Sequence, residues 1–317
     1  MRLSIVNVNC YNSDLSLRLA CNAVSVGEIA WESCIEQSLA SVVGVTSRGM
    51  FLLIPPQRMI FASVENYHSP LTINLDRSCD RLRNIEVGAV AQISDTRLIF
   101  PSIEFSVLLS EERVWRCPAP NLSPRPHTAQ MQTLHAIAAG VMARRGHGGW
   151  ADLLLALLDW STISSLSAEQ AALRDRLSAV RHAVQAGNSS ALQIGLTGLL
   201  GQGRGLTPSG DDVVIGLLLM LARSPRVNSQ ADDENMLKHV IAAAYQGTTT
   251  ISANLIECAA SGQGDERLIT VVDGIIAGSA SLDECVECVL GWGSSSGIDA
   301  LIGMAMAVQG YEERREE

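Results

Sequence analysis

Hydrophobic and polar positions follow two different patterns along this chain. Up to about residue 115, apolar residues form short runs rich in Val, Ile and Phe, separated by Gly, Pro, Asn and Asp. Such runs are typical of β-strands. We expect strands over residues 41–45, 50–54, 59–64, 71–75, 87–93 and 97–100, with a helix within residues 15–39. This part is predicted to be a mostly antiparallel barrel or sandwich.

After residue 127 the apolar positions take a helical period, and Ala and Leu replace the β-branched residues. Ser167 with Gln170, and Ser281 with Glu284, have the spacing of a capping box, which starts a helix. We expect ten helices, over residues 129–145, 150–160, 168–186, 190–200, 211–223, 232–245, 251–260, 266–276, 282–290 and 297–308. The predicted fold class is α+β, with an N-terminal β-rich part followed by a mostly α-helical part.

Four prolines in nine residues, between Cys117 and His127, separate the two patterns. Proline continues neither a helix nor a central strand, so this stretch is the best candidate for a linker. The predicted domains are residues 1–117 (β-rich), 118–127 (linker) and 128–317 (α-helical). A chain of 317 residues with 47% hydrophobic residues is sufficient for two cores.

The charge balance argues against several classes of partner. Asp and Glu outnumber Lys and Arg by 33 to 23, a net charge of −10, whereas non-specific nucleic-acid binding needs dense positive charge. No apolar run approaches the roughly 18 to 20 residues that span a bilayer, and the N-terminus does not resemble a signal peptide. We therefore expect a cytoplasmic protein that binds neither nucleic acid nor membrane.

Eight cysteines are scattered along the chain, and a protein of this size does not need disulfides to be stable. Cys285 and Cys288 form the one close pair, with the spacing of half a zinc or redox motif. No second pair completes a set of four ligands. Because the two thiols lie one turn apart on a predicted helix, we favour core packing over metal or redox chemistry.

The strongest candidate for chemistry is a glycine-rich stretch before an apolar helix. Gly201, Gly203, Gly205 and Gly210 fall within ten positions and are followed by two aspartates and an apolar run over residues 213–222. Glycines let backbone N–H groups approach a ligand, and a helix N-terminus favours an anion. The alternative is that the polar residues only cap the helix and the glycines only allow close packing. The Gly-Lys-Ser/Thr ending of a nucleotide-binding loop is absent.

Two further segments, residues 247–254 and 291–299, place glycine, hydroxyl and amide or carboxylate side chains before an apolar helix. Either could be a plain helix cap. Three such helix starts in one α-helical domain are better explained if they converge on one pocket. The predicted ligand-binding residues are Gly203, Gly205, Thr207, Ser209, Gly210, Asp211, Asp212, Thr249, Ser252, Ser295, Ser296 and Asp299. Asp211 or Asp212 is a candidate ligand of a divalent cation such as Mg²⁺, although no cofactor is certain.

The run of residues 203–212, Gly-Arg-Gly-Leu-Thr-Pro-Ser-Gly-Asp-Asp, with residues 248–252 and 293–299 at similar spacing, resembles a bacterial family of about 300 residues. That family includes a subunit of oxamate carbamoyltransferase, which acts in anaerobic allantoin breakdown. This enzyme moves a carbamoyl group between oxalurate and phosphate and gives oxamate and carbamoyl phosphate. The resemblance covers roughly the last 190 residues and implies small anionic substrates and partner subunits.

We therefore expect a subunit of a carbamoyl- or acyl-transferring enzyme that binds phosphate or carbamoyl phosphate, acts in purine catabolism and needs partner subunits. The alternative is a non-catalytic subunit that uses the same pocket for assembly or for sensing an anionic ligand.

Overall fold

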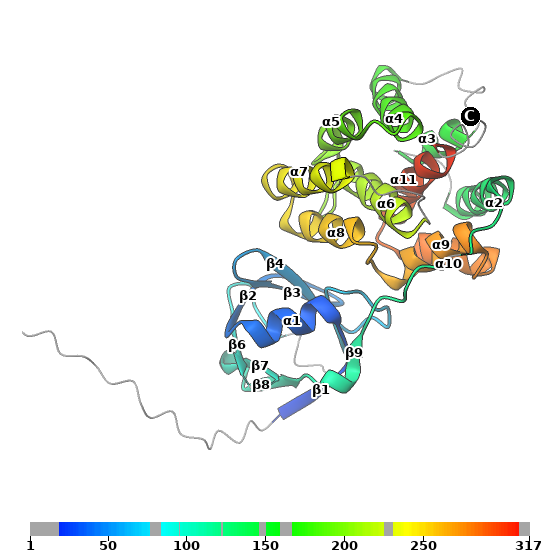
Figure 1. The fold of residues 1–317 in the computed structure, drawn as a ribbon. Helices are drawn as coiled ribbons and strands as arrows, with labels where there is room; N and C mark the ends of the chain where they lie inside the picture. The colour runs from blue at the N-terminus through cyan, green and yellow to red at the C-terminus, as the bar shows by residue number, and fades with distance from the viewer. Residues whose placement is uncertain are drawn as a thin grey trace, which may run out of the picture.

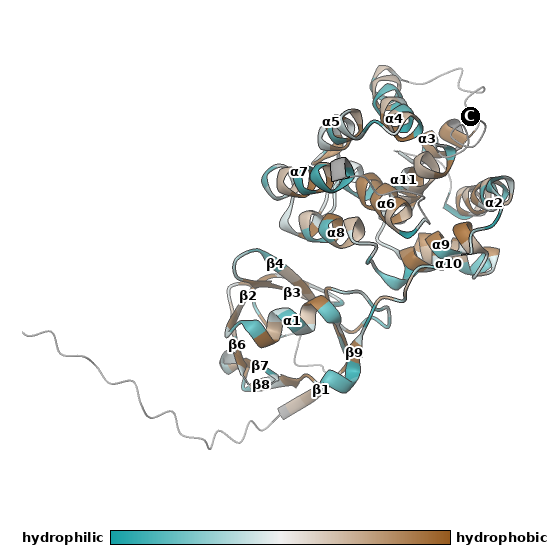
Figure 2. Ribbon diagram, viewed as in Figure 1, coloured by the Kyte–Doolittle hydropathy of each residue, from teal (hydrophilic) through white to brown (hydrophobic). Residues whose placement is uncertain are grey.

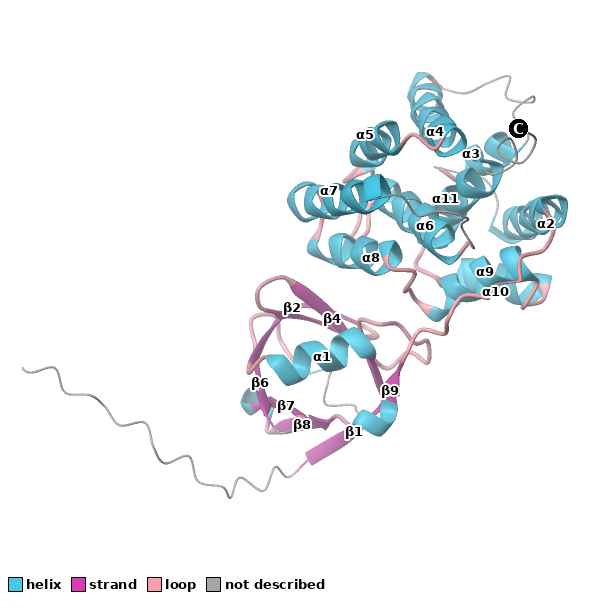
Figure 3. Ribbon diagram, in the orientation of Figure 1, coloured by secondary structure: helices cyan, strands magenta, loops and turns pink. Residues whose placement is uncertain are grey.

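Strands and helices occupy separate parts of the chain in the computed structural model (Figures 1 and 3). The structure describes residues 19–76, 84–94, 96–121, 123–145, 150–158, 167–224 and 231–310. Every described strand ends before residue 116, and ten of the described helices follow residue 126. The predicted α+β class is therefore confirmed.

The strands close into a barrel. They are β1 (Leu19–Gly27), β2 (Leu39–Thr46), β3 (Gly49–Ile54), β4 (Arg58–Ser63), β5 (Thr72–Leu75), β6 (Val90–Ser94), β7 (Arg97–Phe100), β8 (Phe105–Leu108) and β9 (Val114–Trp115). Their order is β5-β4-β3-β2-β6-β7-β8-β1-β9, and the sheet closes on itself because β1 also pairs with β5. Of the two architectures expected, the structure has the barrel. Pairing is mostly antiparallel, as predicted, with parallel exceptions at β1–β8, β1–β9 and β4–β5.

The alternation of side chains decides which residues fill the barrel. In β3, Met50, Leu52 and Ile54 are buried while the residues between them are partly exposed. A two-residue turn joins β2 to β3, since Thr46 pairs with Gly49. In β2, Ala40 and Val42 are buried in the same alternation, and the register then shifts between Val42 and Gly44.

The prediction of a helix within residues 15–39 is only partly correct. Its first described part is strand β1, and the helix α1 covers only Glu28–Glu36. Ala30 and Cys34 of α1 are buried and join the barrel core. The sequence of β1 contains Asn22 and Ser25 among small residues, so neither periodicity is distinct. Its pairing with the distant strands β5, β8 and β9 determines its conformation.

All ten helices predicted after the proline-rich stretch are present. They are α2 (His127–Arg145), α3 (Ala151–Leu158), α4 (Ala168–Ala186), α5 (Ser189–Leu199), α6 (Ser209–Arg223), α7 (Ala231–Gly247), α8 (Thr250–Ala260), α9 (Glu266–Ala277), α10 (Leu282–Gly291) and α11 (Ser296–Gly310). The reciprocal capping bonds of Ser167 and Gln170 start α4 at the predicted residue. Among the described helices, none is long and apolar enough to cross a membrane.

Helices α6 and α11 form the centre of the helical part. Both are buried on nearly all sides and are mostly brown in Figure 2, whereas α4 and α7 at the outside carry teal, hydrophilic residues. A Cβ atom on Gly216 of α6 would lie 1.9 Å from the Ala300 carbonyl oxygen of α11. The two helices therefore pack backbone to backbone, which fixes their N-termini relative to each other.

The proline-rich stretch contacts the helical part at both of its ends. The buried Arg223 at the end of α6 donates to the carbonyl oxygen of Pro118 at 3.0 Å, and the Arg125 N–H donates to that of Ile276 at 2.7 Å. Barrel and helices have separate hydrophobic cores. The predicted domain boundaries stay a prediction.

Candidate functional site

The glycine-rich loop joins α5 to α6, and its path depends on glycine. Gly203 and Gly205 have φ angles of +116° and +106°, which residues with a side chain rarely adopt. A Cβ atom on Gly203 would also lie 2.7 Å from the backbone nitrogen of Ser209, whereas Gly205 faces open space. Gly203 is thus required for the shape of the loop.

Gly210 lies in the first turn of α6, next to the end of α5. A Cβ atom there would lie 2.0 Å from the carbonyl oxygen of Leu199, at the end of α5. Its own N–H donates to the Gln202 carbonyl at 2.8 Å and is not free for a ligand. Gly210 therefore allows the first turn of α6 to pack against α5, and its predicted ligand-binding role stays a prediction.

The three segments converge, as the sequence analysis predicted. The hydroxyl oxygens of Thr207 in the glycine loop and Ser296 at the start of α11 are 3.1 Å apart. The hydroxyl of Thr249, before α8, donates to the carbonyl oxygen of Leu206 in the loop at 2.7 Å. The glycine loop is therefore in contact with the starts of both other helices.

Several first-turn N–H groups of the three helices are used within the protein. Gly210 in α6 donates within the protein, and the N–H of Ser252 in α8 donates to the Thr249 hydroxyl at 3.1 Å. The first N–H groups of α11 donate in the same way to carbonyls of the preceding residues. In contrast, the backbone N–H groups of residues 203–207 donate no hydrogen bond to any part of the chain that the structure describes. The loop therefore offers a ligand a row of backbone donors.

Asp211 links two of the three segments. One of its carboxylate oxygens accepts from the Gly201 N–H at 2.8 Å, and the other accepts from the Thr248 hydroxyl. Both bonds cross between segments, so Asp211 ties the glycine loop to the turn before α8. Both of its oxygens already have partners, and its role as a ligand-binding residue stays a prediction.

Asp212, its neighbour, is fully buried, and neither of its oxygens has a hydrogen-bond partner among the described residues. Burial raises the pKa of Asp212 from 3.8 to about 8. The nearby hydroxyls of Ser296 and Thr207 lower the pKa by less, although neither forms a hydrogen bond of ordinary geometry, and the charges of Asp299 and Asp211 raise it. At neutral pH this carboxyl is therefore mostly protonated.

Asp299 brings a second carboxyl to the same place from α11. It is buried, and its Oδ2 atom has no partner in the described part of the chain. Burial raises the pKa of Asp299 to about 6, while the hydroxyls of Ser209 and Ser295 and the charge of Arg145 lower it. The interior of the site is thus acidic, and hydroxyl groups surround its two carboxyls.

The structure sorts the predicted site residues into two groups. Those that surround the unpartnered carboxyls or offer free backbone donors are Gly203, Gly205, Thr207, Ser209, Asp212, Ser295, Ser296 and Asp299. Those whose polar groups or packing serve the protein itself are Gly210, Asp211, Thr249 and Ser252. The binding roles of both groups stay a prediction.

A resident metal finds little support in this geometry. Within the described ranges, no group of three or more His, Cys, Asp and Glu side chains could hold a metal ion. Asp211, one of the two candidate ligands, has both oxygens occupied. Cys285 and Cys288 pack in or against the helical core as expected, and burial raises the pKa of both thiols to about 11.

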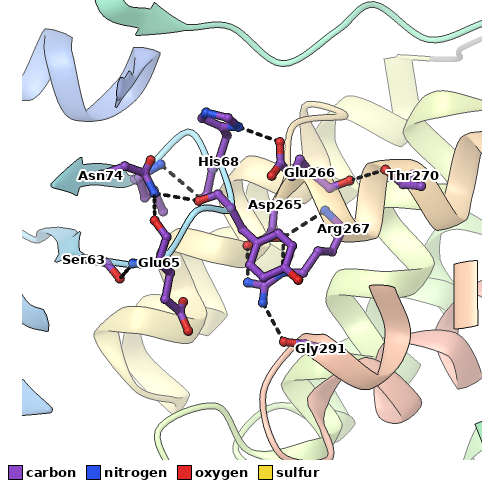
Figure 4. Close-up of polar contacts among 12 residues, drawn as sticks. Ser63, Glu65, His68, Asn74, Asp265, Glu266, Arg267, Thr270 and Gly291 are labelled. Atoms are coloured by element: carbon purple, nitrogen blue, oxygen red, sulfur yellow. Dashed lines mark hydrogen bonds and ion pairs between the residues drawn. The ribbon is translucent and has the colours of Figure 1, made fainter. Parts of the chain in front are cut away.

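A buried ion pair that the sequence did not predict lies where the barrel meets the helices (Figure 4). Asp265 accepts from Nε and Nη2 of Arg267 at 2.8 and 2.7 Å. The guanidinium of Arg267 also donates to the Gly291 carbonyl oxygen at 2.6 Å and lies 4.1 Å from the centre of the Tyr67 ring. Tyr67 belongs to the barrel part, whereas Gly291 begins the segment that leads to Ser295 and Ser296. A charged pair two residues apart before an apolar helix was the available sequence clue.

The barrel also holds α8. Asn254 is buried, and its side chain accepts from the Met59 N–H at 3.2 Å and donates to the Gln57 carbonyl at 2.9 Å. Arg58 adds hydrogen bonds to Asn254 at 3.1 Å and to Glu257 at 2.9 Å. The barrel thus contacts residues 247–254 directly through Asn254 and is linked to Gly291 through Arg267.

These contacts define a class of site: a glycine loop with free backbone donors and hydroxyls, next to buried carboxyls without hydrogen-bond partners, in a helical region. Residues 199–308 match the family described as oxamate carbamoyltransferase subunit AllH. The resemblance inferred from the sequence is confirmed, and the matched segment contains all three converging segments. No curated protein and no solved structure matches the chain.

Proposed function

We propose that this chain is a cytoplasmic subunit of a carbamoyl-transferring enzyme of allantoin catabolism, and that its glycine loop binds the anionic part of a small substrate. The observation that carries the proposal is that the segment similar to the oxamate carbamoyltransferase subunit is the one with free loop donors and unpartnered buried acids. Phosphate, carbamoyl phosphate and oxamate all present oxyanions to such donors.

The proposed reaction requires positioning more than a strong nucleophile. An oxygen of phosphate attacks the carbamoyl carbon of oxalurate, the bond from that carbon to the oxamate nitrogen breaks, and that nitrogen takes up the proton that the phosphate loses. Carbamoyl phosphate and oxamate result. Backbone N–H groups of residues 203–207 and the Thr207 and Ser209 hydroxyls would hold the oxyanion, which lowers the barrier by fixing the reacting atoms and the developing charge.

The test is an assay of the complex of this chain with the partner subunits that co-purify with it. We expect Gly203→Ala to reduce carbamoyl phosphate formation from oxalurate and phosphate at least tenfold while the complex still assembles, because the loop loses its shape. Gly88→Ala is the matched control, since Gly88 has a φ of +91° in the barrel part with nothing near its Cβ position. It imposes similar backbone strain away from the site.

The outcomes separate the proposal from its rival. Unchanged turnover in the Gly203→Ala complex contradicts a binding role for the loop. A complex that fails to form with Gly203→Ala but forms with Gly88→Ala favours a non-catalytic assembly subunit.

A further inference from the structure

The two buried carboxyls carry an inference that rests on the proposed function and makes it more specific. We infer that Asp212 and Asp299 form a subsite for a primary amide, so that the bound substrate places its –CO–NH₂ group on these carboxyls and its oxyanion on the glycine loop. The starting observation is the lack of hydrogen-bond partners at both Asp212 oxygens and at Asp299 Oδ2.

Unpartnered acceptors in a protein interior require donors from somewhere. A buried polar atom without a partner costs about 1–3 kcal/mol, and native proteins keep few of them. Three such oxygens lie in one cluster, contributed by α6 and α11, and the backbone packing of those two helices fixes the cluster. The missing donors are thus best supplied by a ligand.

The charge of the cluster decides the kind of ligand. Asp211 adds a third buried acid, while Arg145, whose positive charge lowers the pKa of Asp299, is exposed. A ligand that brings only oxygens, such as oxalate, would face repulsion and would leave the acids without donors. A primary amide brings two N–H donors and no added charge.

The protonation of the pair suits an amide as well. A protonated carboxyl donates its O–H to the amide carbonyl oxygen while its other oxygen accepts an amide N–H, so the two groups pair through two hydrogen bonds. Because burial keeps the pKa of Asp212 at about 8, this form dominates at neutral pH. A metal ion alone would satisfy the acids but would leave the loop donors of residues 203–207 without an acceptor.

The experiment compares oxamate with oxalate, which replaces the amide by a second carboxylate. Binding of each to the full chain, or to its complex if the chain alone binds neither, is measured by calorimetry without divalent cations. We expect oxamate to bind at least about tenfold more tightly, since a site that hydrogen-bonds an N–H group rejects the analogue without it. In Asp212→Asn the ratio should fall toward one, because the asparagine amide brings two N–H donors of its own to oxalate, whereas the carboxyl takes its donors from the ligand.

Asp211→Asn is the matched control. Asp211 is the adjacent residue, of the same type and equally buried, but its oxygens have partners. This variant should lose stability yet keep the preference for oxamate. A shifted preference in this variant, with none in Asp212→Asn, would overturn the assignment.

Two further results would overturn the inference without touching the proposed function. One is a wild-type protein that binds oxalate as tightly as oxamate while phosphate and carbamoyl phosphate still bind. The other is binding that needs added Mg²⁺, with the need abolished by Asp212→Asn, which would make the pair a cation site. If the assembled complex binds none of oxamate, oxalate, phosphate and carbamoyl phosphate, the result would instead contradict the proposed function itself.

Discussion

The helical region has two clusters with buried carboxyl groups, and they differ in whether the carboxyl oxygens have hydrogen-bond partners. At the start of α9, Asp265 receives two bonds from the Arg267 guanidinium and one from the Arg267 N–H. At the starts of α6 and α11, Asp212 and Asp299 are buried to a similar degree, yet three of their four oxygens have no hydrogen-bond partner in the part of the chain that the structure describes. The fold thus pairs the buried Asp265 with an arginine but leaves Asp212 and Asp299 without such a partner.

The difference points to different roles. A paired and hydrogen-bonded buried charge is compatible with a structural function, and Arg267 links barrel, α9 and the segment after α10 through Tyr67 and Gly291. Unpaired buried carboxyls with raised pKa values are typical of sites whose partners arrive with a ligand. The barrel accordingly contributes by holding the framework, while the chemistry we propose lies on the helical side.

The largest effect is expected from breaking the paired cluster. Arg267→Ala leaves Asp265 buried without its counter-ion, which typically costs about 3–5 kcal/mol. The free energy of unfolding from urea denaturation measures it. Arg267→Met combined with Asp265→Leu removes both charges and should cost much less. If the single variant loses under about 1 kcal/mol, the cluster does not have the structural role we assign.

The sequence was sufficient to predict the helical part and insufficient for the start of the barrel. Capping residues and helical periodicity are local, so α4 was predicted at its observed bounds. Strands β1 and β9 were missed because their pairing is between segments far apart in the chain. Strand β8 was missed as well, although it pairs with the adjacent strand β7. The short β9 has only two residues and no periodicity to recognise.

The candidate site shows the same division at the level of single residues. Glycine and hydroxyl spacing predicted that three helix starts converge. It could not distinguish Gly203 from Gly210, because the latter is constrained by the carbonyl of Leu199. Nor could it distinguish Asp211 from Asp212, since the partner of Asp211 is Thr248, 37 residues further along.

A smaller effect, of opposite sign, is expected at the unpaired cluster. The pKa of Asp212 is raised on folding from 3.8 to about 8, so between these pH values the folded chain keeps a proton that the unfolded chain loses. Raising the pH through this window therefore favours unfolding. Asp212→Asn removes the effect and should be more stable than wild type by roughly 1–3 kcal/mol above pH 8, with little difference near pH 4.

Urea denaturation from pH 4 to pH 9 checks this sign and window. Asp299→Asn gives an internal control, because the pKa of Asp299 is raised only to about 6 and its stability gain should level off at that lower pH. A loss of stability in Asp212→Asn at pH 8 would show that the charged carboxylate is satisfied in solution, and the contrast between the two clusters would disappear.

The smallest effect is expected at an exposed ion pair. Comparing it with the buried pair tests whether burial, rather than charge alone, causes the stability loss in Arg267→Ala. Arg144 of α2 lies 3.2 Å from Asp283 and also contacts Glu287, both on α10, but the two acids have exposed side chains. Water and salt screen such pairs, so Arg144→Ala should change the free energy of unfolding by less than about 0.5 kcal/mol, and less still at 0.5 M NaCl. The loss in Arg267→Ala should persist at that salt concentration, because its acidic partner is buried. Equal salt sensitivity of the two variants would mean that the buried cluster is as accessible to solvent as the exposed one.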